Sequence, residues 1–417
     1  MNNILQARAT SFSMPSAAVA VMAFVCVWTS SWAVIPNVLP LPAALGMLSL
    51  GLYIWSEILR GRIKRVTKAE LLFGLFCLWA AASMSWSVDA KASKGLAFQY
   101  ASCLITFAAV SRVSLKPRHW RMIGWSFVFG IMVTALIFLI TAQQAAGNGR
   151  FGIEDINANY IAYSIATAFP VLFMLMAEKK NSLRWKIFSS AWMGICILTV
   201  LYTGSRGAII SVFLSIVALL FPANRRHIAK FVLVLAAFAI YFFAIVYFLP
   251  DSITSRLGFL SILTGKSVGS VDLSYRLDNW PFALALFYTN VVRGIGVGAY
   301  EHVSPLNLRV HNIPLSLLVE LGVIGFILYF LVIYEIFITV IRNAKNPLIR
   351  RGGVVLLMGW LPIAMSGAWE VSIVAWLVFA WFMGATSHPA PVRNQLFNRT
   401  PKRSGVVDEG FVDPTHA

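Results

Sequence analysis

Residues 202–211 read YTGSRGAIIS and lie between two apolar stretches, 187–201 and 208–221. Apolar stretches that approach about 20 residues cross the hydrocarbon core of a membrane as helices. The residues between the two stretches are too few for a loop, so they predict a tight turn, and Arg206 adds a permanent positive charge to it. This part of the chain therefore predicts a helical hairpin in a membrane, with a cation at its tip.

The same alternation of apolar runs and short polar gaps continues along the whole chain. Of the 417 residues, 59% are apolar and 12% are charged, which is not the composition of a soluble globular protein. Since the apolar runs have the length of membrane-spanning helices, we expect an all-α polytopic membrane protein with about 12 transmembrane helices. The predicted spans are 16–35, 38–59, 70–88, 95–111, 121–142, 157–177, 187–202, 207–222, 228–249, 312–341, 353–367 and 369–386.

The formal net charge of +18 could indicate a nucleic-acid partner, but the distribution of the cations indicates a membrane topology instead. When the gaps between spans are assigned alternately to two sides, most lysines and arginines fall on the side of the N-terminus. That side is cytoplasmic by the positive-inside rule, so we expect both termini to be cytoplasmic and no nucleic-acid partner. The cations of the outer side are Lys91, Lys94, Arg150, Arg206, Arg256, Lys266, Arg276, Arg293 and Arg309.

The chain is predicted to have four parts. Residues 1–249 carry nine transmembrane helices with short loops, 250–310 form one large periplasmic loop, 311–386 carry three helices, and 387–417 form a disordered cytoplasmic tail. A loop as long as the second part is unusual without secondary structure, so we expect it to be partly helical. Its stretch DNWPFALALFYTNVV (278–292) has helical periodicity and is predicted to lie along the outer membrane surface.

Arg206 is the first candidate for a functional residue. It is surrounded by Thr203, Gly204, Ser205 and Gly207, and the span that follows runs inward, so the N-terminus of that helix faces outward. The unpaired N–H groups of a helix N-terminus and a guanidinium group both favour an anion such as phosphate. The alternative is an interfacial turn whose arginine reaches toward the membrane surface.

His311 and Arg276 are the other two main candidates on the outer side. His311 directly precedes the tenth span, where Asn312 is a plausible N-cap and Pro314 fits the first helical turn. An imidazole titrates near neutral pH and can act as a general base. Arg276 belongs to SYRLDNW (274–280) in the large loop. The alternatives are an interfacial histidine with no role and a surface arginine beside a membrane-anchoring tryptophan.

The stretch GIGVG (294–298) has the glycine spacing of a dinucleotide-binding motif. That motif requires a strand before it and a helix that opens after it, and this context is missing here. We therefore expect a turn or a segment of closely packed glycines.

Three motifs, in this order, resemble the O-antigen ligase and O-antigen polymerase superfamily. They are YTGSRGAIIS (202–211), YRLDNW (275–280) followed by VVRGIGVGAY (291–300), and HNIPLSLLVELGVIGFILY (311–329). NANYIAYSIATAFPVL (157–172) is similar to the segment that precedes these motifs in the family. The resemblance implies a GT-C-like, multi-pass glycosyltransferase of the bacterial inner membrane, with its active site facing the periplasm. Its donor would be a polysaccharide carried on undecaprenyl pyrophosphate.

The functional arginines and histidine of that family carry over to Arg206, Arg276 and His311. The two arginines would stabilise the pyrophosphate leaving group, and the histidine would deprotonate a sugar hydroxyl of the acceptor. We expect direct displacement with inversion at the anomeric carbon, because no outer carboxylate is obviously placed as a nucleophile. Further candidate site residues are Arg150, Asn159 and Arg309.

No cofactor is expected, and the enzyme is predicted to be independent of metal ions. Among the carboxylates of the outer side, only Glu154 and Asp155 are adjacent, and cations lie nearby. The first outer loop is essentially residues 36–37, so it has no acidic residue to hold a divalent cation. We expect arginines to take the place of Mg²⁺ at the leaving group.

The expected partners are undecaprenyl-pyrophosphate-linked O-antigen, a lipid A–core acceptor and membrane lipids. With this acceptor the chain would be an O-antigen ligase. The twelve predicted spans and the single large late loop favour the ligase over the polymerase. One alternative is the polymerase of the same superfamily, which joins one carrier-linked chain to another. A second alternative is a transporter or flippase for a lipid-linked glycan, but this would need a polar pathway through the middle of the membrane, where the spans hold few charges.

Overall fold

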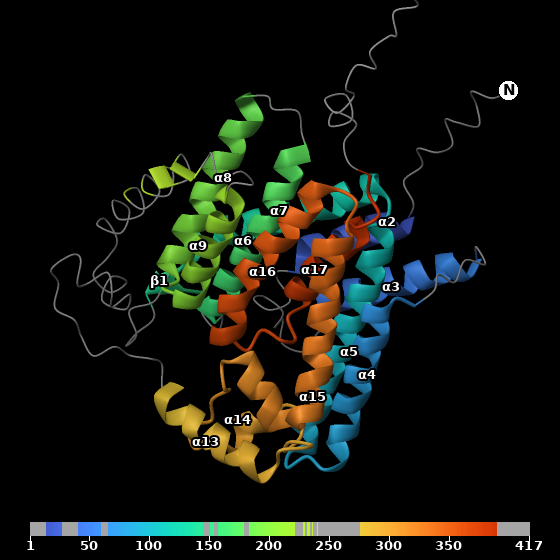
Figure 1. The fold of residues 1–417 in the computed structure, drawn as a ribbon, viewed down its shortest axis with the longest axis vertical. Helices are drawn as coiled ribbons and strands as arrows, with labels where there is room; N and C mark the ends of the chain where they lie inside the picture. Colours follow the sequence, from blue (N-terminus) through green and yellow to red (C-terminus); the bar gives the residue numbers. More distant parts are fainter. Residues whose placement is uncertain are drawn as a thin grey trace, which may run out of the picture.

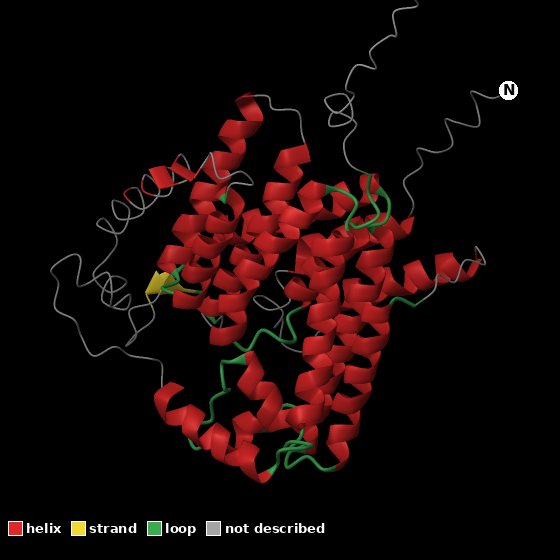
Figure 2. Cartoon of the chain, viewed as in Figure 1, coloured by secondary structure: helices red, strands yellow, loops and turns green. Residues whose placement is uncertain are grey.

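The computed structural model is almost entirely helical in the residues that it describes (Figure 2). The described residues are 14–26, 41–59, 66–144, 151–153, 157–178, 183–221 and 276–389, with a few single positions between 228 and 240. The helices are α2 (Met14–Val25), α3 (Leu41–Leu59), α4 (Lys68–Ala82), α5 (Ala90–Val113), α6 (Pro117–Thr141), α7 (Ala158–Glu178), α8 (Leu183–Tyr202), α9 (Arg206–Leu220), α13 (Arg276–Thr289), α14 (Tyr300–Val303), α15 (Ile313–Ile338), α16 (Pro347–Ser366) and α17 (Ile373–Ala385). Two short strands, β1 (Gln143–Gln144) and β2 (Phe151–Gly152), pair antiparallel.

The prediction of an all-α polytopic membrane protein is confirmed. Among the described residues, six helices are long and apolar enough to cross a membrane: α4 with the short helix after it, α5, α6, α7, α15 with the π-helical turn after it, and α16. Shorter apolar helices include α8, α9 and α17. Most of the predicted ninth span (228–249), the predicted loop before Arg276 and the tail after 389 lie outside the described residues. The number of spans, their sidedness and the four-part division stay predictions.

Local signals set several helix boundaries. Thr67 and Glu70 form a capping box at the start of α4, and the Asp89 carboxylate accepts from the Ala92 N–H at the start of α5 (2.9 Å). α16 begins at Pro347 rather than at the predicted residue 353, because the side chain of Asn346 caps it. The polar first turn of α16 hides this start from a prediction that follows apolar residues alone.

Helices α9 and α16 pack against each other in antiparallel orientation along a seam of small residues. Gly207, at the start of α9, meets Ser366 at the end of α16, and Ser211, one turn along α9, donates a hydrogen bond to the carbonyl of Gly359. A side chain at Gly359 would meet the hydroxyl of Ser215. Small residues let two helix backbones approach closely in a membrane. This seam fixes the start of α9 against the end of α16.

The two ends of the bundle are distinct (Figure 1). Helices α13 and α14 gather at one end, beyond the bodies of α9 and α16, and we call this the α13 end. At the other end the Lys345 N–H donates to the Thr386 carbonyl (3.1 Å), and a ring nitrogen of His388 lies 2.9 Å from the Ser114 carbonyl oxygen. α16 therefore starts beside the end of α17 and runs toward the α13 end.

Helix α15 is broken at Gly322, where φ is +66° and ψ is −171°. The predicted tenth span (312–341) matches an apolar helix of span length, Ile313–Asn343, whose helical backbone is interrupted at Gly322. The loop after α13 lies across the break: the Gly296 N–H donates to the Glu320 carbonyl (2.9 Å), and the Val323 N–H donates to the Val291 carbonyl (2.9 Å). The carbonyl and N–H groups released by the break are therefore hydrogen-bonded within the protein, as membrane depth requires.

The glycines of GIGVG are closely packed, as the sequence predicts. Gly294, Gly296 and Gly298 all have positive φ, at +68°, +107° and +72°. A side chain at Gly294 would collide with the backbone of Glu320, so this loop contacts α15 through its bare backbone. The loop and α15 thus form one unit at the α13 end.

Candidate functional site

Arg206 is the first residue of α9, at the position that the sequence predicts. The turn before it is tight: Gly204 has φ +60°, and the Thr203 hydroxyl donates to the Val200 carbonyl (2.6 Å). Ser205 is the N-cap, but its side chain makes no capping hydrogen bond. The first N–H groups of α9 therefore lack the side-chain cap that usually satisfies a helix N-terminus. A half-buried arginine stands at that N-terminus.

The backbone beside Arg206 is held against the end of α16. A Cβ at Gly207 would collide with the Ser366 hydroxyl and would lie 2.9 Å from the Ser366 Cβ and 3.3 Å from the Tyr163 hydroxyl. The Tyr163 hydroxyl in turn donates to the Ser366 carbonyl (3.0 Å). Helices α7, α9 and α16 thus meet beside Arg206 with no room for a larger residue at position 207.

His311 lies next to the same helix end. Asn312 caps α15 as the sequence predicts, because its Oδ1 accepts from the Leu315 N–H (3.0 Å). Its Nδ2 donates to the Met365 carbonyl (3.3 Å). Met365 and Ser366 are consecutive, so the residue after Arg206 and the residue after His311 contact neighbouring positions of α16. The structure therefore brings the backbones of Arg206 and His311 to one end of one helix.

The backbone of His311 is unusual. Its φ is +52°, in the left-handed region that residues with a side chain seldom adopt. Such a conformation costs about 1–3 kcal/mol and persists only where the surrounding structure enforces it, which occurs most often at functional sites. This strain adds weight to the interpretation of His311 as a functional residue rather than an ordinary interfacial histidine.

Arg309 belongs to a charged cluster beside His311. Its Nε lies 2.8 Å from Oε2 of Glu301. Burial lowers the pKa of Arg309, but the Glu301 carboxylate, with Tyr160 and Glu370 nearby, outweighs this and raises it, so the guanidinium stays charged. The prediction of Arg309 as a site residue therefore meets a competing explanation, because its charge already has a partner.

Glu370 is a residue of this region that the sequence analysis did not single out. Its side chain is 2% exposed, and within the described part of the chain its Oε2 has no hydrogen-bond partner. Burial raises the pKa of Glu370, and the nearby Arg309 limits the increase. Trp369, the residue before it, packs against two tyrosines of α7. The centroid of its ring lies 5.6 Å from that of Tyr160 and 5.4 Å from that of Tyr163. Glu370 is the second residue of the predicted span 369–386, and a glutamate at the edge of a span carries no sequence signal of burial.

The remaining predicted site residues are described less fully. Arg276 is the first residue of α13, and its side chain is not among the described ones. The Asn159 N–H donates to Oδ1 of Asn157 (3.0 Å) in the first turn of α7, one residue before Tyr160. Arg150 lies outside the described residues. Arg206, His311 and Arg309 can be related to one another through the contacts of described residues around the end of α16.

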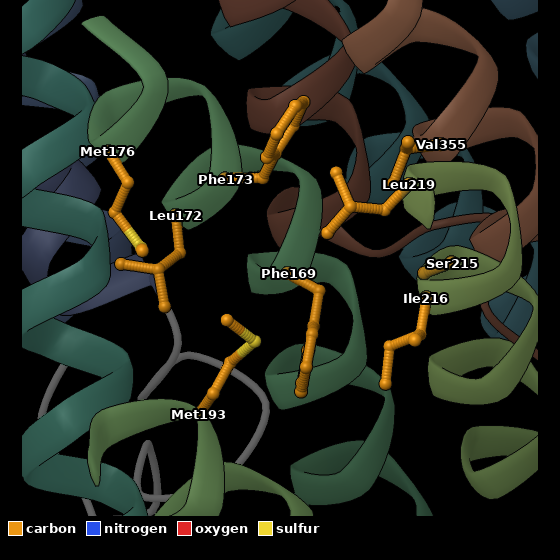
Figure 3. A pocket seen from close by; sticks show the side chains of 9 residues that line it. All are labelled: Phe169, Leu172, Phe173, Met176, Met193, Ser215, Ile216, Leu219 and Val355. Atoms are coloured by element: carbon orange, nitrogen blue, oxygen red, sulfur yellow. The ribbon is translucent and has the colours of Figure 1, made fainter. Parts of the chain in front are cut away.

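A cavity of about 110 Å³ lies between α7, α8, α9 and α16 (Figure 3). Phe169, Met193 and Ile216 are among the side chains that line it, and Ser215 is the one polar residue among its described lining. Ile216 is ten residues after Arg206, which corresponds to roughly 15 Å along a helix. The cavity is apolar and lies along the helix from Arg206, so it does not offer the groups that glycosyl transfer requires.

No group of three or more His, Cys, Asp or Glu residues in the described ranges could hold a metal ion. Glu154 and Asp155 are not part of those ranges. The cations near the site are arginines, and they can stabilise phosphate oxygens without a metal.

The comparison with protein families identifies the central part of the chain. Residues 191–330 match the model of the family described as O-antigen ligase. The matched segment contains Arg206, Arg276, Arg309 and His311, whereas Arg150 and Asn159 precede it. No curated protein matches the chain. This match over 191–330 supports the resemblance of the chain to the O-antigen ligase and polymerase family.

Proposed function

We propose that the protein is a glycosyltransferase of the bacterial inner membrane that works at the periplasmic face. It transfers O-antigen polysaccharide from undecaprenyl pyrophosphate to a sugar hydroxyl of lipid A–core, without a metal ion and with inversion at the anomeric carbon. The observation that supports the proposal is that the residues after Arg206 and His311 contact the same end of α16, through the Gly207–Ser366 and Asn312–Met365 contacts. The reaction needs a fixed cation and a titratable base in one site, and this arrangement places their backbones at one helix end.

The donor binds through its pyrophosphate. Arg206 offers a guanidinium, and the N-terminus of α9 adds N–H groups that the side chain of its N-cap, Ser205, does not cap. Arg276, at the start of α13, supplies the second cation. Because the leaving group gains negative charge as its bond to the sugar breaks, cations held in place stabilise the transition state more than the ground state.

His311 acts as the general base. Its imidazole accepts the proton of the acceptor hydroxyl while the hydroxyl oxygen forms a bond to the anomeric carbon. The bond from that carbon to the pyrophosphate oxygen breaks, and its electron pair leaves with undecaprenyl pyrophosphate. The imidazolium then releases its proton to solvent. General-base catalysis of this kind contributes about 10²–10⁴ in rate.

The ligase and the polymerase of this family share this chemistry and differ in the acceptor. We favour lipid A–core as the acceptor because the sequence predicts a single large late loop between the ninth and tenth spans. A transporter of lipid-linked glycan would have no need of a base beside the cation. The polar pathway that a transporter needs through the middle of the membrane is also not expected from the spans, which hold few charges.

The test is an assay of purified protein in proteoliposomes with carrier-pyrophosphate glycan and lipid A–core. A ligase yields a lipopolysaccharide of higher mass and free undecaprenyl pyrophosphate. A polymerase yields a longer carrier-linked glycan whether or not lipid A–core is present. A transporter moves the donor between leaflets and leaves both masses unchanged. Either of the last two outcomes would refute the proposed function.

A further inference from the structure

Asn279 of α13 is the centre of a buried hydrogen-bond network. Its side chain is 3% exposed. Its Oδ1 accepts hydrogen bonds from the Tyr300 hydroxyl (2.7 Å) and the Ser304 hydroxyl (2.8 Å). Both partners lie at α14, so one face of the amide joins α13 to α14. Buried amides are costly unless they are satisfied, and this one is satisfied on its acceptor side.

The donor side of the same amide holds the segment that leads to His311. The Asn279 Nδ2 lies 3.1 Å from the Arg309 carbonyl oxygen and 3.4 Å from that of Leu308. The next residue, Trp280, donates its indole N–H to the Val310 carbonyl (2.9 Å). Two consecutive residues of α13 thus hold three consecutive carbonyls, 308 to 310. The next residue along the chain is His311.

His311 is therefore fixed from both directions. On its N-terminal side, residues 308–310 are held by α13. On its C-terminal side, Asn312 is held by the first turn of α15 and by the Met365 carbonyl. The left-handed conformation of His311, with φ +52°, needs such support because its own side chain disfavours it. Loss of either support lets the backbone relax and turns the imidazole.

Helix α13 also begins at Arg276, one turn before Asn279. A single short helix therefore carries the second predicted cation of the site and holds the backbone of the predicted base. The distance between these two groups depends on the rigidity of α13 and on its bonds to residues 308–310. The buried contacts of Trp280 and Asn279 thus connect leaving-group stabilisation with proton abstraction.

We propose that Asn279 and Trp280 are positioning residues for glycosyl transfer. They hold residues 308–310 so that the imidazole of His311 keeps a fixed place relative to the cations of the site. This inference rests on the proposed function, because it assigns the two residues a role through His311. Neither side chain is required to contact a substrate.

The test compares Trp280→Phe with Trp381→Phe in the purified full-length protein. Trp280→Phe keeps an aromatic ring and removes one indole N–H bond to a carbonyl. Trp381 donates the same kind of bond to the Trp120 carbonyl (2.7 Å) and is buried, but it lies on α17 and contacts α6. Trp381→Phe therefore controls for the stability cost of losing such a bond.

We expect both variants to show similar losses in thermal stability. Only Trp280→Phe should lower kcat, by about tenfold or more, since misplacement of a catalytic group by about 1 Å costs up to about 10²-fold. The donor KM should stay within about twofold, because the cations remain. Asn279→Asp is a second variant that keeps the acceptor for Tyr300 and Ser304 and loses the amide donor. It should show the same split between kcat and KM.

A double-mutant comparison with His311→Ala distinguishes positioning from general structural support. If Trp280 acts through His311, Trp280→Phe lowers the rate in the wild type and leaves the residual rate of His311→Ala unchanged. Equal losses in both backgrounds, or equal activity of Trp280→Phe and Trp381→Phe, would overturn the inference. If the wild type transfers no glycan, the proposed function fails instead, so the two failures are separate.

Discussion

The contact between Gly207 and Ser366 leads to a prediction about a single methyl group. Gly207→Ala would place a Cβ 2.9 Å from the Ser366 Cβ and in collision with the Ser366 hydroxyl. The hydroxyl can rotate away, but the Cβ cannot move without its backbone. Because ordinary contacts begin near 3.4 Å, the start of α9 and the end of α16 must separate by about half an ångström. Arg206 and His311 adjoin these two segments, so their distance changes with them.

The expected cost appears mainly in catalysis. In a helix interior, alanine gains about 1 kcal/mol over glycine, whereas overpacking a close contact costs about 1–3 kcal/mol. The net effect on stability is therefore a loss of at most about 2 kcal/mol. A displacement approaching 1 Å between catalytic groups can cost about 10²-fold in rate. We expect kcat/KM to fall by roughly 10- to 100-fold while the thermal midpoint changes little.

The assay is the formation of higher-mass lipopolysaccharide by purified variants, with thermal unfolding measured in the same detergent. Gly194→Ala in α8 is the matched control, because nothing lies within 4 Å of a Cβ at that position. It should keep wild-type activity. The double variant Gly207→Ala/Ser366→Gly removes both colliding atoms and should recover most of the lost activity.

Two results would refute this reasoning. If Gly207→Ala is as active as Gly194→Ala, the spacing of α9 and α16 does not control the site. If Gly207→Ala is inactive only because it is unfolded, and Ser366→Gly restores folding without restoring transfer, the contact is structural and the site lies elsewhere.

Further predictions concern residues around the same helix end. Asn312→Asp keeps the cap on α15 and loses the amide donor to Met365, so we expect kcat to fall while the helix content measured by circular dichroism stays constant. Arg206→Lys keeps the charge and loses the two-pronged geometry of the guanidinium, so the donor KM should rise. Burial raises the pKa of Glu370 in the folded state above its value in the unfolded chain. The protonated carboxyl therefore contributes its full stabilisation of the fold below the unfolded pKa, and this stabilisation is lost as pH rises through the folded pKa. Glu370→Gln should therefore gain thermal stability relative to the wild type as pH rises, and equal stability at all pH values would contradict this. Treatment with a chelator should leave transfer unchanged, and restoration of a lost activity by Mg²⁺ or Mn²⁺ would contradict the metal-independent mechanism.

Features that depend on a few neighbouring residues could be predicted from the sequence. The start of α9 at Arg206, the cap by Asn312 and the close packing of GIGVG all follow from local rules about turns, caps and glycine. The helical class follows from the length of the apolar runs. The break at Gly322 could not be predicted in this way. A glycine inside an apolar run is compatible with a continuous helix, and the break depends on a loop that supplies hydrogen bonds from about 25 residues away in the chain.

The candidate site was predictable as a set of residue types but not as a geometry. Arg206 and His311 stand out in the sequence because both fall on the predicted outer side, where the positive-inside rule does not account for them. Their chain neighbours, Gly207 and Asn312, contact Ser366 and Met365 because of how the helices pack. Neither Met365 nor Ser366 has a chemical feature that marks it in the sequence. Asn279 is similar, because a single amide that satisfies partners from two other segments looks like any polar residue on a helix.

The most direct test of the central claim is a single-turnover experiment that measures donor binding and glycan transfer separately. The account predicts different defects for the two groups at the end of α16. Arg206→Ala should bind carrier-pyrophosphate glycan more weakly, whereas His311→Ala should bind it normally and transfer it about 10²–10⁴ times more slowly. Transfer by His311→Ala at the wild-type rate would contradict the account, as would normal donor binding and transfer by Arg206→Ala.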